Sequence, residues 1–198
     1  MKEYYDRRAP DYDDWYHGRG RYGDRDADAW AADLDAVLQT IASLAPVRTL
    51  DVACGTGFLT RHLRGEVVGL DQSTSMLDEA RRQAPHATYV QAEGLELPFP
   101  DHSFGRVFSG HFYGHLDEAE RLRFLEEARR VAPELVLVDA AERPNHEREE
   151  IQHRLLSAGS EWPILKRYFT AEVLRDELGG GDVLHDGAFF VVVRTPPT

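Results

Sequence analysis

Basic charge is scarce in this sequence of 198 residues, which carries 23 lysines and arginines against 35 aspartates and glutamates and has a formal net charge of −12. Such a chain repels a phosphate backbone or an anionic membrane unless its basic residues gather on one face. The arginine pairs at 7–8, 81–82 and 129–130 are interleaved with acidic residues, so no basic face is expected. We therefore expect neither nucleic acid nor a membrane among its partners.

Cysteine and long apolar segments are also nearly absent. Cys54 is the only cysteine, which excludes a disulfide within the chain and fits a reducing compartment. The first residues are charged where a secretory signal needs apolar ones, and no apolar run approaches the ~20 residues that span a membrane. We expect a cytoplasmic protein, and the alanine- and arginine-rich composition indicates a bacterial one.

What the sequence does contain is an alternation of helical and strand patterns. Apolar residues recur with helical spacing over about 27–45, 118–131 and 170–178. The predicted parallel strands are Arg48–Ala53, Glu66–Asp71, Ala87–Gln91, Arg106–Ser109 and Glu134–Asp139, and most segments between them are expected to be helices. The strands Asp182–His185 and Ala188–Val193, joined by a tight Asp186-Gly187 turn, complete an antiparallel hairpin. The sequence thus predicts one α/β domain, a doubly wound seven-stranded, mostly parallel sheet with a C-terminal antiparallel hairpin and helices on both faces.

The first predicted strand contains Asp51 and leads into a turn with Gly55 and Gly57, after which we expect a helix. Glycines let the backbone approach a ligand closely and adopt positive φ. Twenty residues after Asp51, the next strand ends in Asp71. An acid in that position can accept hydrogen bonds from both hydroxyls of a ribose, so the two strand ends together predict a nucleotide site.

These motifs also support a family resemblance. The stretch Asp51-x-Ala-x-Gly-x-Gly57, Asp71 and the segment 91–101 (QAEGLELPFPD) resemble the class I, Rossmann-like, S-adenosylmethionine-dependent methyltransferases of small molecules. The resemblance is strongest from about 47 to 110. It implies S-adenosyl-L-methionine as the cofactor and a small-molecule acceptor, with the chain a monomer or a homodimer. The cofactor-binding residues that we expect are Tyr5, Tyr12, Asp51, Ala53, Gly55, Gly57, Asp71, Gln72, Glu93, Gly94, Leu95 and Ser109.

The resemblance assigns parts of the cofactor to these residues. Asp51 and the turn at 53–57 would meet the methionine part, with Ser109 lining the same end; Asp71 would hold the ribose, and Glu93 the adenine amino group. Ala53 replaces the glycine usual in the family, and Glu93 replaces the commoner aspartate. The aromatic segment with Tyr5 and Tyr12 would fold over the cofactor; the alternative is a surface helix whose tyrosines pack on the domain.

The predicted elements, including an interruption of the strand–helix alternation at 140–169, divide the chain into parts with different roles. Residues 1–45 would form an N-terminal helical cap, 46–139 the cofactor-binding core, 140–169 a cover over the acceptor pocket, and 170–198 the final helix and hairpin. The cover contains Trp162, Ile164, Tyr168 and Phe169, whose apolar and aromatic character favours a small, partly apolar acceptor.

Candidates for the reaction follow the fourth strand. His111 is the first candidate for a base that takes a proton from the acceptor, since histidine titrates in the useful range, and Tyr113 is a second. His115 is more typical of a residue that shapes the loop. Many methyl transfers need only an oriented nucleophile, so a packing role for His111 remains open. No metal is expected: His146 and His153 lie seven residues apart on a probable helix in a charged stretch, which favours a solvated face.

Two other functions remain open from the sequence. One is a protein that binds S-adenosylmethionine without methylating, such as a sensor or a repurposed enzyme. The other is an NAD(P)-dependent oxidoreductase, which is disfavoured because Thr60 stands where the dinucleotide fingerprint needs a small residue. The acceptor and the atom methylated, whether oxygen, nitrogen or carbon, are not evident from the sequence.

Overall fold

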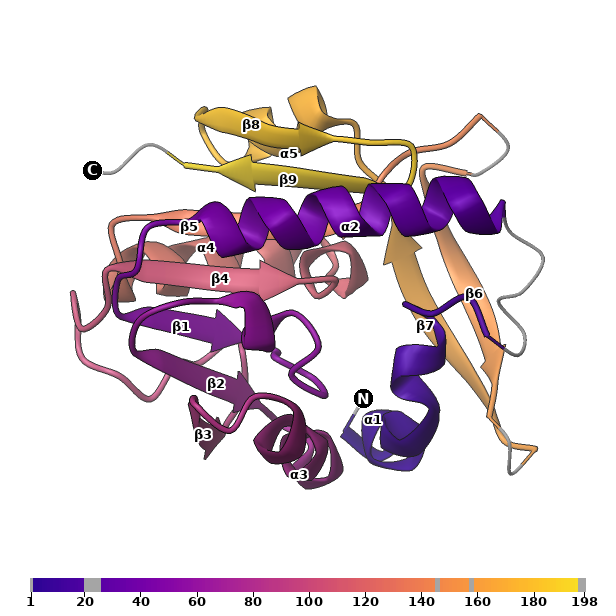
Figure 1. Cartoon of the computed structure of the whole chain (residues 1–198), viewed down its shortest axis with the longest axis horizontal. Coiled ribbons are helices and arrows are strands. Elements are labelled where there is room, and N and C mark those ends of the chain that lie inside the picture. Colours follow the sequence, from indigo (N-terminus) through magenta and orange to yellow (C-terminus); the bar gives the residue numbers. More distant parts are fainter. Residues whose placement is uncertain (1, 20–25, 145–146, 157–158, 196–198) are drawn as a thin grey trace.

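The computed structural model describes residues 2–19, 26–144, 147–156 and 159–195. Its main sheet has seven strands in the order β3-β2-β1-β4-β5-β9-β8. Strands β1 to β5 are mutually parallel, whereas β9 runs antiparallel to both β5 and β8. This confirms the predicted doubly wound sheet with a C-terminal antiparallel hairpin. A separate antiparallel pair, β6 and β7, stands beyond the arrowheads of the parallel strands (Figure 1).

The bounds of the elements follow the chain. The strands are β1 (Thr49–Val52), β2 (Val67–Asp71), β3 (Thr88–Gln91), β4 (Arg106–Gly110), β5 (Leu135–Ala140), β6 (Glu149–Leu155), β7 (Glu161–Arg167), β8 (Asp182–Asp186) and β9 (Phe190–Arg194). The α-helices are α1 (Lys2–Arg8), α2 (Ala27–Ser43), α3 (Thr74–Gln83), α4 (Glu118–Val131) and α5 (Ala171–Glu177). Short 3₁₀ turns are η1 (Ala9–Asp14), η3 (Thr60–His62) and η4 (Tyr113–His115).

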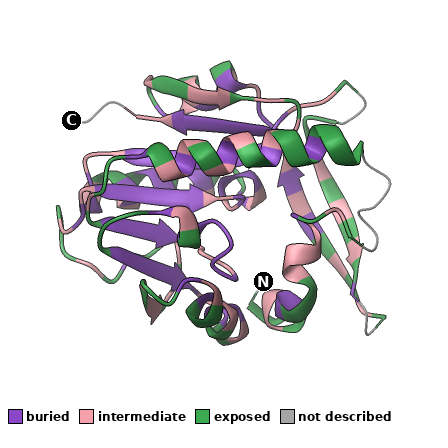
Figure 2. Cartoon of the chain, viewed as in Figure 1, coloured by how far each residue is buried: buried purple, intermediate pink, exposed green. Residues whose placement is uncertain are grey.

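Strands β1, β2 and β5 are buried on both faces because helices cover both sides of the sheet (Figure 2). Leu50 and Leu137 face the core under α4, while Phe108 and Val136 face the core under α2. Such continuous apolar strands are typical of parallel sheets. The carboxyl ends of β1, β2 and β4 therefore meet at one edge, where a ligand site is expected.

Local capping explains where the helices begin. Asp26 accepts from the Ala29 amide at the start of α2, and Ser73 accepts from the Met76 amide at the start of α3. At the start of α4, Asp117 and Glu120 form a reciprocal capping box. The helix predicted at 27–45 ends at Ser43, two residues early. Among the described helices, none is long and apolar enough to cross a membrane.

Three predictions of local structure are wrong. The expected helix after the glycine turn is only the 3₁₀ turn η3, because Phe58, Leu59 and Leu63 are all buried and the chain folds back at once. The probable helix containing His153 is strand β6, and His146 lies outside the described residues. The connection between β8 and β9 spans 187–189 instead of a two-residue turn, since both strands are shifted.

The hairpin β6–β7 is fixed to the rest of the molecule at two places. On α1, Tyr4 packs against Leu156 and Ile164 in a small buried cluster. On the main sheet, Lys166 of β7 forms a 2.8 Å ion pair with Asp139 of β5, and both side chains are buried. The hairpin and α1 thereby enclose the space beyond the carboxyl ends of the parallel strands.

Candidate functional site

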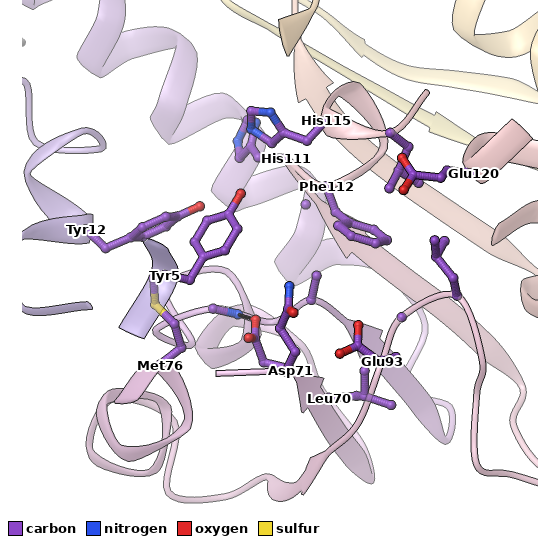
Figure 3. Close-up of a pocket in the computed structure, with 17 residues that line it drawn as sticks. Tyr5, Tyr12, Leu70, Asp71, Met76, Glu93, His111, Phe112, His115 and Glu120 are labelled. Carbon is purple, nitrogen blue, oxygen red and sulfur yellow. Dashed lines mark hydrogen bonds between the residues drawn. The ribbon is translucent and has the colours of Figure 1, made fainter. Parts of the chain in front are cut away.

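A cavity of about 290 Å³ lies at the carboxyl ends of β1, β2 and β4. Its wall contains most of the predicted cofactor-binding residues: Tyr5, Tyr12, Ala53, Gly55, Asp71, Gln72, Glu93, Gly94 and Leu95. Gly57 is not in this wall. Figure 3 shows Asp71 and Glu93 on one side of the cavity and His111 and His115 on the other, with Tyr5 and Tyr12 beside them. We call this space the first cavity.

Asp71 is oriented by the backbone on both sides of it. One carboxylate oxygen accepts from the Gly55 amide at 3.0 Å, and the other accepts from the Ser73 amide at 2.8 Å. Each oxygen keeps a further acceptor position, and Asp71 lines the first cavity. The carboxylate therefore ties the glycine turn to the end of β2 and can still receive two hydroxyl groups.

Asp51 lies deeper than Asp71. It is buried, accepts from the Thr60 hydroxyl at 2.7 Å and lines a small cavity beneath the first one, together with Tyr12 and Gly55. Burial raises the pKa of Asp51 to about 7, and the neighbouring charge of Asp71 adds to the rise against the Thr60 hydrogen bond. Burial likewise raises the pKa of Asp71 to about 6, against its two backbone hydrogen bonds. A cation bound here would stabilise the charged form of both carboxylates.

The turn between these carboxylates has an unusual backbone. Ala53 has a φ of 56°, in the left-handed region that favours glycine, and Gly55 and Gly57 have positive φ as well. A Cβ atom on Gly57 would lie 3.0 Å from the Ala80 backbone of α3. Gly57 is therefore required for close packing against α3, while Ala53 shows that the turn survives without the glycine usual in the resembling family.

At the far end of the first cavity the wall is apolar. The side chains of Leu70, Leu95 and Phe112 line it, with the exposed Glu93 at its rim. A Cβ atom on Gly94 would lie only 3.0 Å from the Phe112 ring, so the bare backbone there leaves room for a flat group. An apolar slot with a carboxylate at its edge suits a heteroaromatic ring that carries an amino group.

Tyr5 and Tyr12 close the first cavity from the N-terminal side. Their rings lie 6.4 Å apart, and Tyr12 also has the Arg8 guanidinium 5.0 Å from its ring centroid. Burial raises the pKa of Tyr12 to about 12 and that of Tyr5 still further, so both hydroxyls stay protonated. Both tyrosines line the first cavity instead of only packing on the surface, and their placement over a cofactor stays a prediction.

A larger cavity of about 580 Å³ adjoins the first one. Tyr12, His111 and His115 belong to the walls of both. Much of the remaining wall comes from α1, from α2, from the chain after β5 and from the hairpin β6–β7, which lies within the segment 140–169 predicted as a cover. We call this space the second cavity. Two adjoining cavities with a shared histidine wall can hold two molecules side by side.

His111 stands at the junction. Its φ of 56° is in the left-handed region, it is buried, and neither ring nitrogen has a hydrogen-bond partner within the described structure. Its Nδ1 atom lies 4.0 Å from Asp139, and its ring packs edge-on against Trp15. Burial lowers the pKa of His111 to about 3, although Asp139 favours the charged form. The imidazole is therefore neutral and has acceptor capacity unused by the protein.

Four predicted site residues line neither the first nor the second cavity: Asp51, Gly57, Ser109 and Tyr113. The Ser109 hydroxyl donates to the Val52 carbonyl at 2.8 Å inside the sheet, and its neighbour Gly110 lines the first cavity instead. Tyr113 donates to Glu177 at 3.0 Å and packs against Phe124 and Phe169 in the core. The 3₁₀ turn η4 directs Tyr113 toward α5, although it follows His111 by only two residues.

Sequence reasoning missed most of the second cavity. The unpredicted members of its wall include Arg8, Trp15, Trp30, Arg143, Arg154 and Lys166. The alternation of Glu150, Gln152 and Arg154 with exposed Ile151 was a signal for a strand whose polar side faces inward. Across the part of the chain that the structure describes, no cluster of potential metal ligands is found.

The chain is similar to known methyltransferases. Residues 50–134 match the family model described as "Methyltransferase domain". Trans-aconitate 2-methyltransferase of Methylobacterium nodulans is 32% identical over 157 residues, which cover 75% of this chain and 57% of that protein. Demethylmenaquinone methyltransferase of Thermotoga maritima is 33% identical over 100 residues, which cover 48% of this chain and 43% of that protein. The chain thus spans about half the length of the curated relatives it matches.

Solved structures resemble the chain over nearly its whole length. A structure described as the DhpI–SAH complex has a TM-score of 0.73 and 26% identity, covering 98% of this chain and 94% of that one. A second, the DhpI–SAM–HEP complex, has a TM-score of 0.72 at the same identity and covers 98% of this chain and 95% of that one.

Proposed function

Because this chain belongs to the class I S-adenosylmethionine-dependent methyltransferases, we propose that it moves a methyl group from S-adenosylmethionine to an oxygen, nitrogen or carbon atom of a small metabolite. The observation that carries the proposal is the pair of adjoining cavities with His111, His115 and Tyr12 in both walls. A methyl transfer needs two molecules held in line and shielded from water, and this arrangement suits that need.

The residues of the first cavity fit the cofactor. Asp71, already oriented by two backbone amides, would receive the ribose hydroxyls, with Gln72 beside it. Glu93 and the backbone at Gly94 and Leu95 would meet adenine in the apolar slot. At the other end, the turn at 53–57 and the raised pKa of Asp51 favour a cationic group, as on the methionine part.

When bound, S-adenosylmethionine supplies an electrophilic methyl group on a sulfonium. The chain would supply position and a hydrogen-bond acceptor: neutral His111 would accept a hydrogen bond from the nucleophile and hold it toward the first cavity. Its lowered pKa makes it a weak base in the structure described, so orientation is the larger part of its proposed role. Tyr5 and Tyr12 would exclude water from the methionine end.

The proposal includes the setting of the reaction. We place the enzyme in the cytoplasm, acting on a small molecule and not on nucleic acid, as a monomer or homodimer. The net charge of −12 and the single cysteine support this setting. Sedimentation analysis of the purified protein would report its oligomeric state.

Calorimetry followed by turnover tests the function. We expect S-adenosylmethionine and S-adenosylhomocysteine to bind with one site per chain and NAD not to bind. Radiolabelled methyl groups should then pass into a component of a metabolite extract. Tight binding without transfer to any extract would favour the sensor or repurposed enzyme, and binding of NAD alone would favour the oxidoreductase.

A further inference from the structure

The second cavity is basic although the chain as a whole is acidic. Among the described residues of its wall, four side chains are cationic, Arg8, Arg143, Arg154 and Lys166, and one is a carboxylate, Glu150. The sequence has 35 acidic and 23 basic residues, so a random sample of its charged side chains would be mainly acidic. This concentration of positive charge is therefore a specific property of the cavity.

The partners of two of these cations, Arg143 and Arg154, leave their positive charge uncompensated. Lys166 is neutralised by Asp139 at 2.8 Å. Arg154 donates to the neutral Gln152 side chain at 2.9 and 3.2 Å, and the Arg143 guanidinium lies over the rings of Tyr168 and Phe189.

In the described parts of the chain, neither Arg143 nor Arg154 forms an ion pair with a carboxylate. Glu150 interacts instead with Gln152 and with the Tyr168 hydroxyl. An anion in the cavity would supply the compensation that the protein itself does not.

The cations also act on one another across the same space. Burial lowers the pKa of Lys166; Asp139 opposes this, while Arg154 and Arg143 lower it further. The pKa of His115 is lowered by burial first and then by Lys166 and Arg154. Side chains from two segments, the chain after β5 and the hairpin, thus converge on one volume beside His111.

We propose that the methyl acceptor carries an oxyanion, either a carboxylate or a phosphoryl group, and that Arg143 and Arg154 bind this group in the second cavity. Planar guanidinium groups pair with both oxyanions through two parallel hydrogen bonds. Binding there would fix one end of the acceptor at the hairpin and leave the other end at His111, next to the first cavity. The proposal rests on the proposed function, because it names the substrate class of that same site.

Titration of the full chain with simple anions tests this. The probes are inorganic phosphate and succinate, with chloride added to equal ionic strength, and the readout is tryptophan fluorescence, because Trp15 and Trp30 line the second cavity. We expect saturable binding of at least one probe by the wild type. Arg154→Gln and Arg143→Gln should each weaken it by at least about tenfold, whereas Arg154→Lys should retain part of it.

Arg148→Gln is the matched control. It makes the same change just before β6, on an exposed arginine that pairs with Glu142 and does not line the cavity. Calorimetry with S-adenosylhomocysteine, which reports on the first cavity, verifies that each variant is folded.

The proposal is supported if the cavity variants lose saturable binding and Arg148→Gln keeps it. Tighter binding of succinate would then indicate a carboxylate acceptor, and tighter binding of phosphate a phosphoryl acceptor. Absence of saturable binding by the wild type, or equal weakening in Arg148→Gln, would overturn it. Failure of S-adenosylhomocysteine to bind would reject the proposed function separately, since the anion titration needs no cofactor.

Discussion

The two cavities of this molecule are built by different means. The first lies on the sheet, and most of its polar residues and glycines come from short segments at the carboxyl ends of β1, β2, β3 and β4. The second is assembled from α1, α2, the chain after β5 and the hairpin β6–β7, which are far apart in sequence, and its charges are basic. The comparison suggests that cofactor binding, which proteins of one fold can share, depends on the strand ends of the sheet. Acceptor binding, which differs between proteins, would depend on the segments added around the sheet.

The largest expected effect concerns the wall shared by the cavities. His111→Asn should lower turnover by ~10²-fold while leaving cofactor affinity nearly unchanged, since asparagine tolerates the left-handed backbone but cannot place the same acceptor atom. Because the pKa of His111 is about 3, wild-type turnover should show no titration of this histidine between pH 6 and 8. Steady-state kinetics over that range would test both statements.

The matched control is His102→Asn, at an exposed residue with a φ of 54°. It should leave turnover unchanged. If His111→Asn alters only thermal stability and turnover per folded molecule is preserved, His111 is a packing residue and both cavities work by position alone.

The next effect is confined to the first cavity. Asp71→Ala should weaken cofactor binding by at least tenfold, because hydrogen bonds to a charged group contribute about 1.5–3 kcal/mol each. Anion binding in the second cavity should persist. Calorimetry would measure the loss, with Asp78→Ala, an exposed aspartate paired with Arg81 on α3, as the control. Unchanged affinity in a folded Asp71→Ala protein would contradict the role.

A pH titration separates the acidic cavity from the basic one. Asp51 and Asp71 have pKa values raised to about 7 and about 6. Below pH 7 protons therefore compete with a cationic cofactor for these carboxylates. Affinity for S-adenosylmethionine should rise ~tenfold from pH 6 to pH 8, and Asp51→Asn should flatten the rise. Affinity that is independent of pH in the wild type would show that these carboxylates do not meet the cation.

The free energy of unfolding of the unliganded protein should fall as pH rises, opposite to the cofactor affinity. Carboxyl groups whose folded-state pKa exceeds the unfolded value favour the folded state at low pH, and this contribution is lost as pH rises through 6 and 7. The melting temperature should therefore increase when the protein is moved from pH 8 toward pH 5. Differential scanning calorimetry of wild type and Asp51→Asn would check this, since the variant should lose part of the dependence.

The smallest effect concerns the glycine turn. Ala53→Gly should stabilise the fold by up to about 1 kcal/mol, or ~2–4 °C in Tm, because glycine adopts a φ of 56° without the strain of a Cβ atom. The same replacement at Ala32, exposed on α2, should destabilise the protein by a similar amount. If thermal melts showed that Ala53→Gly and Ala32→Gly shift Tm in the same direction, the proposed backbone strain at Ala53 would be refuted.

The sequence predicted what depends on local pattern. Periodicity located α2, α4 and the parallel strands, and the spacing of Asp51 and Asp71 predicted where two carboxylates meet. The helix after Gly57 could not be excluded because the burial of Phe58, Leu59 and Leu63 depends on α2, which lies elsewhere in the sequence.

The hairpin β6–β7 was missed for a different reason. Its polar residues Gln152 and Arg154 face inward while Ile151 and Leu155 are more than half exposed, at 56% each. The usual rule that apolar residues face inward and polar residues outward fails on such a strand, because its inner face lines a cavity instead of a core. Departure from the expected pattern thus indicated a strand that lines a cavity.

His111 has a consequence for how the protein would respond to selection. Its left-handed backbone and its two buried, unbonded ring nitrogens each cost folding free energy that another residue would not. In a library of variants screened for heat resistance alone, glycine and other replacements at position 111 should be enriched, and under the role proposed for His111 these more stable variants should have lower turnover.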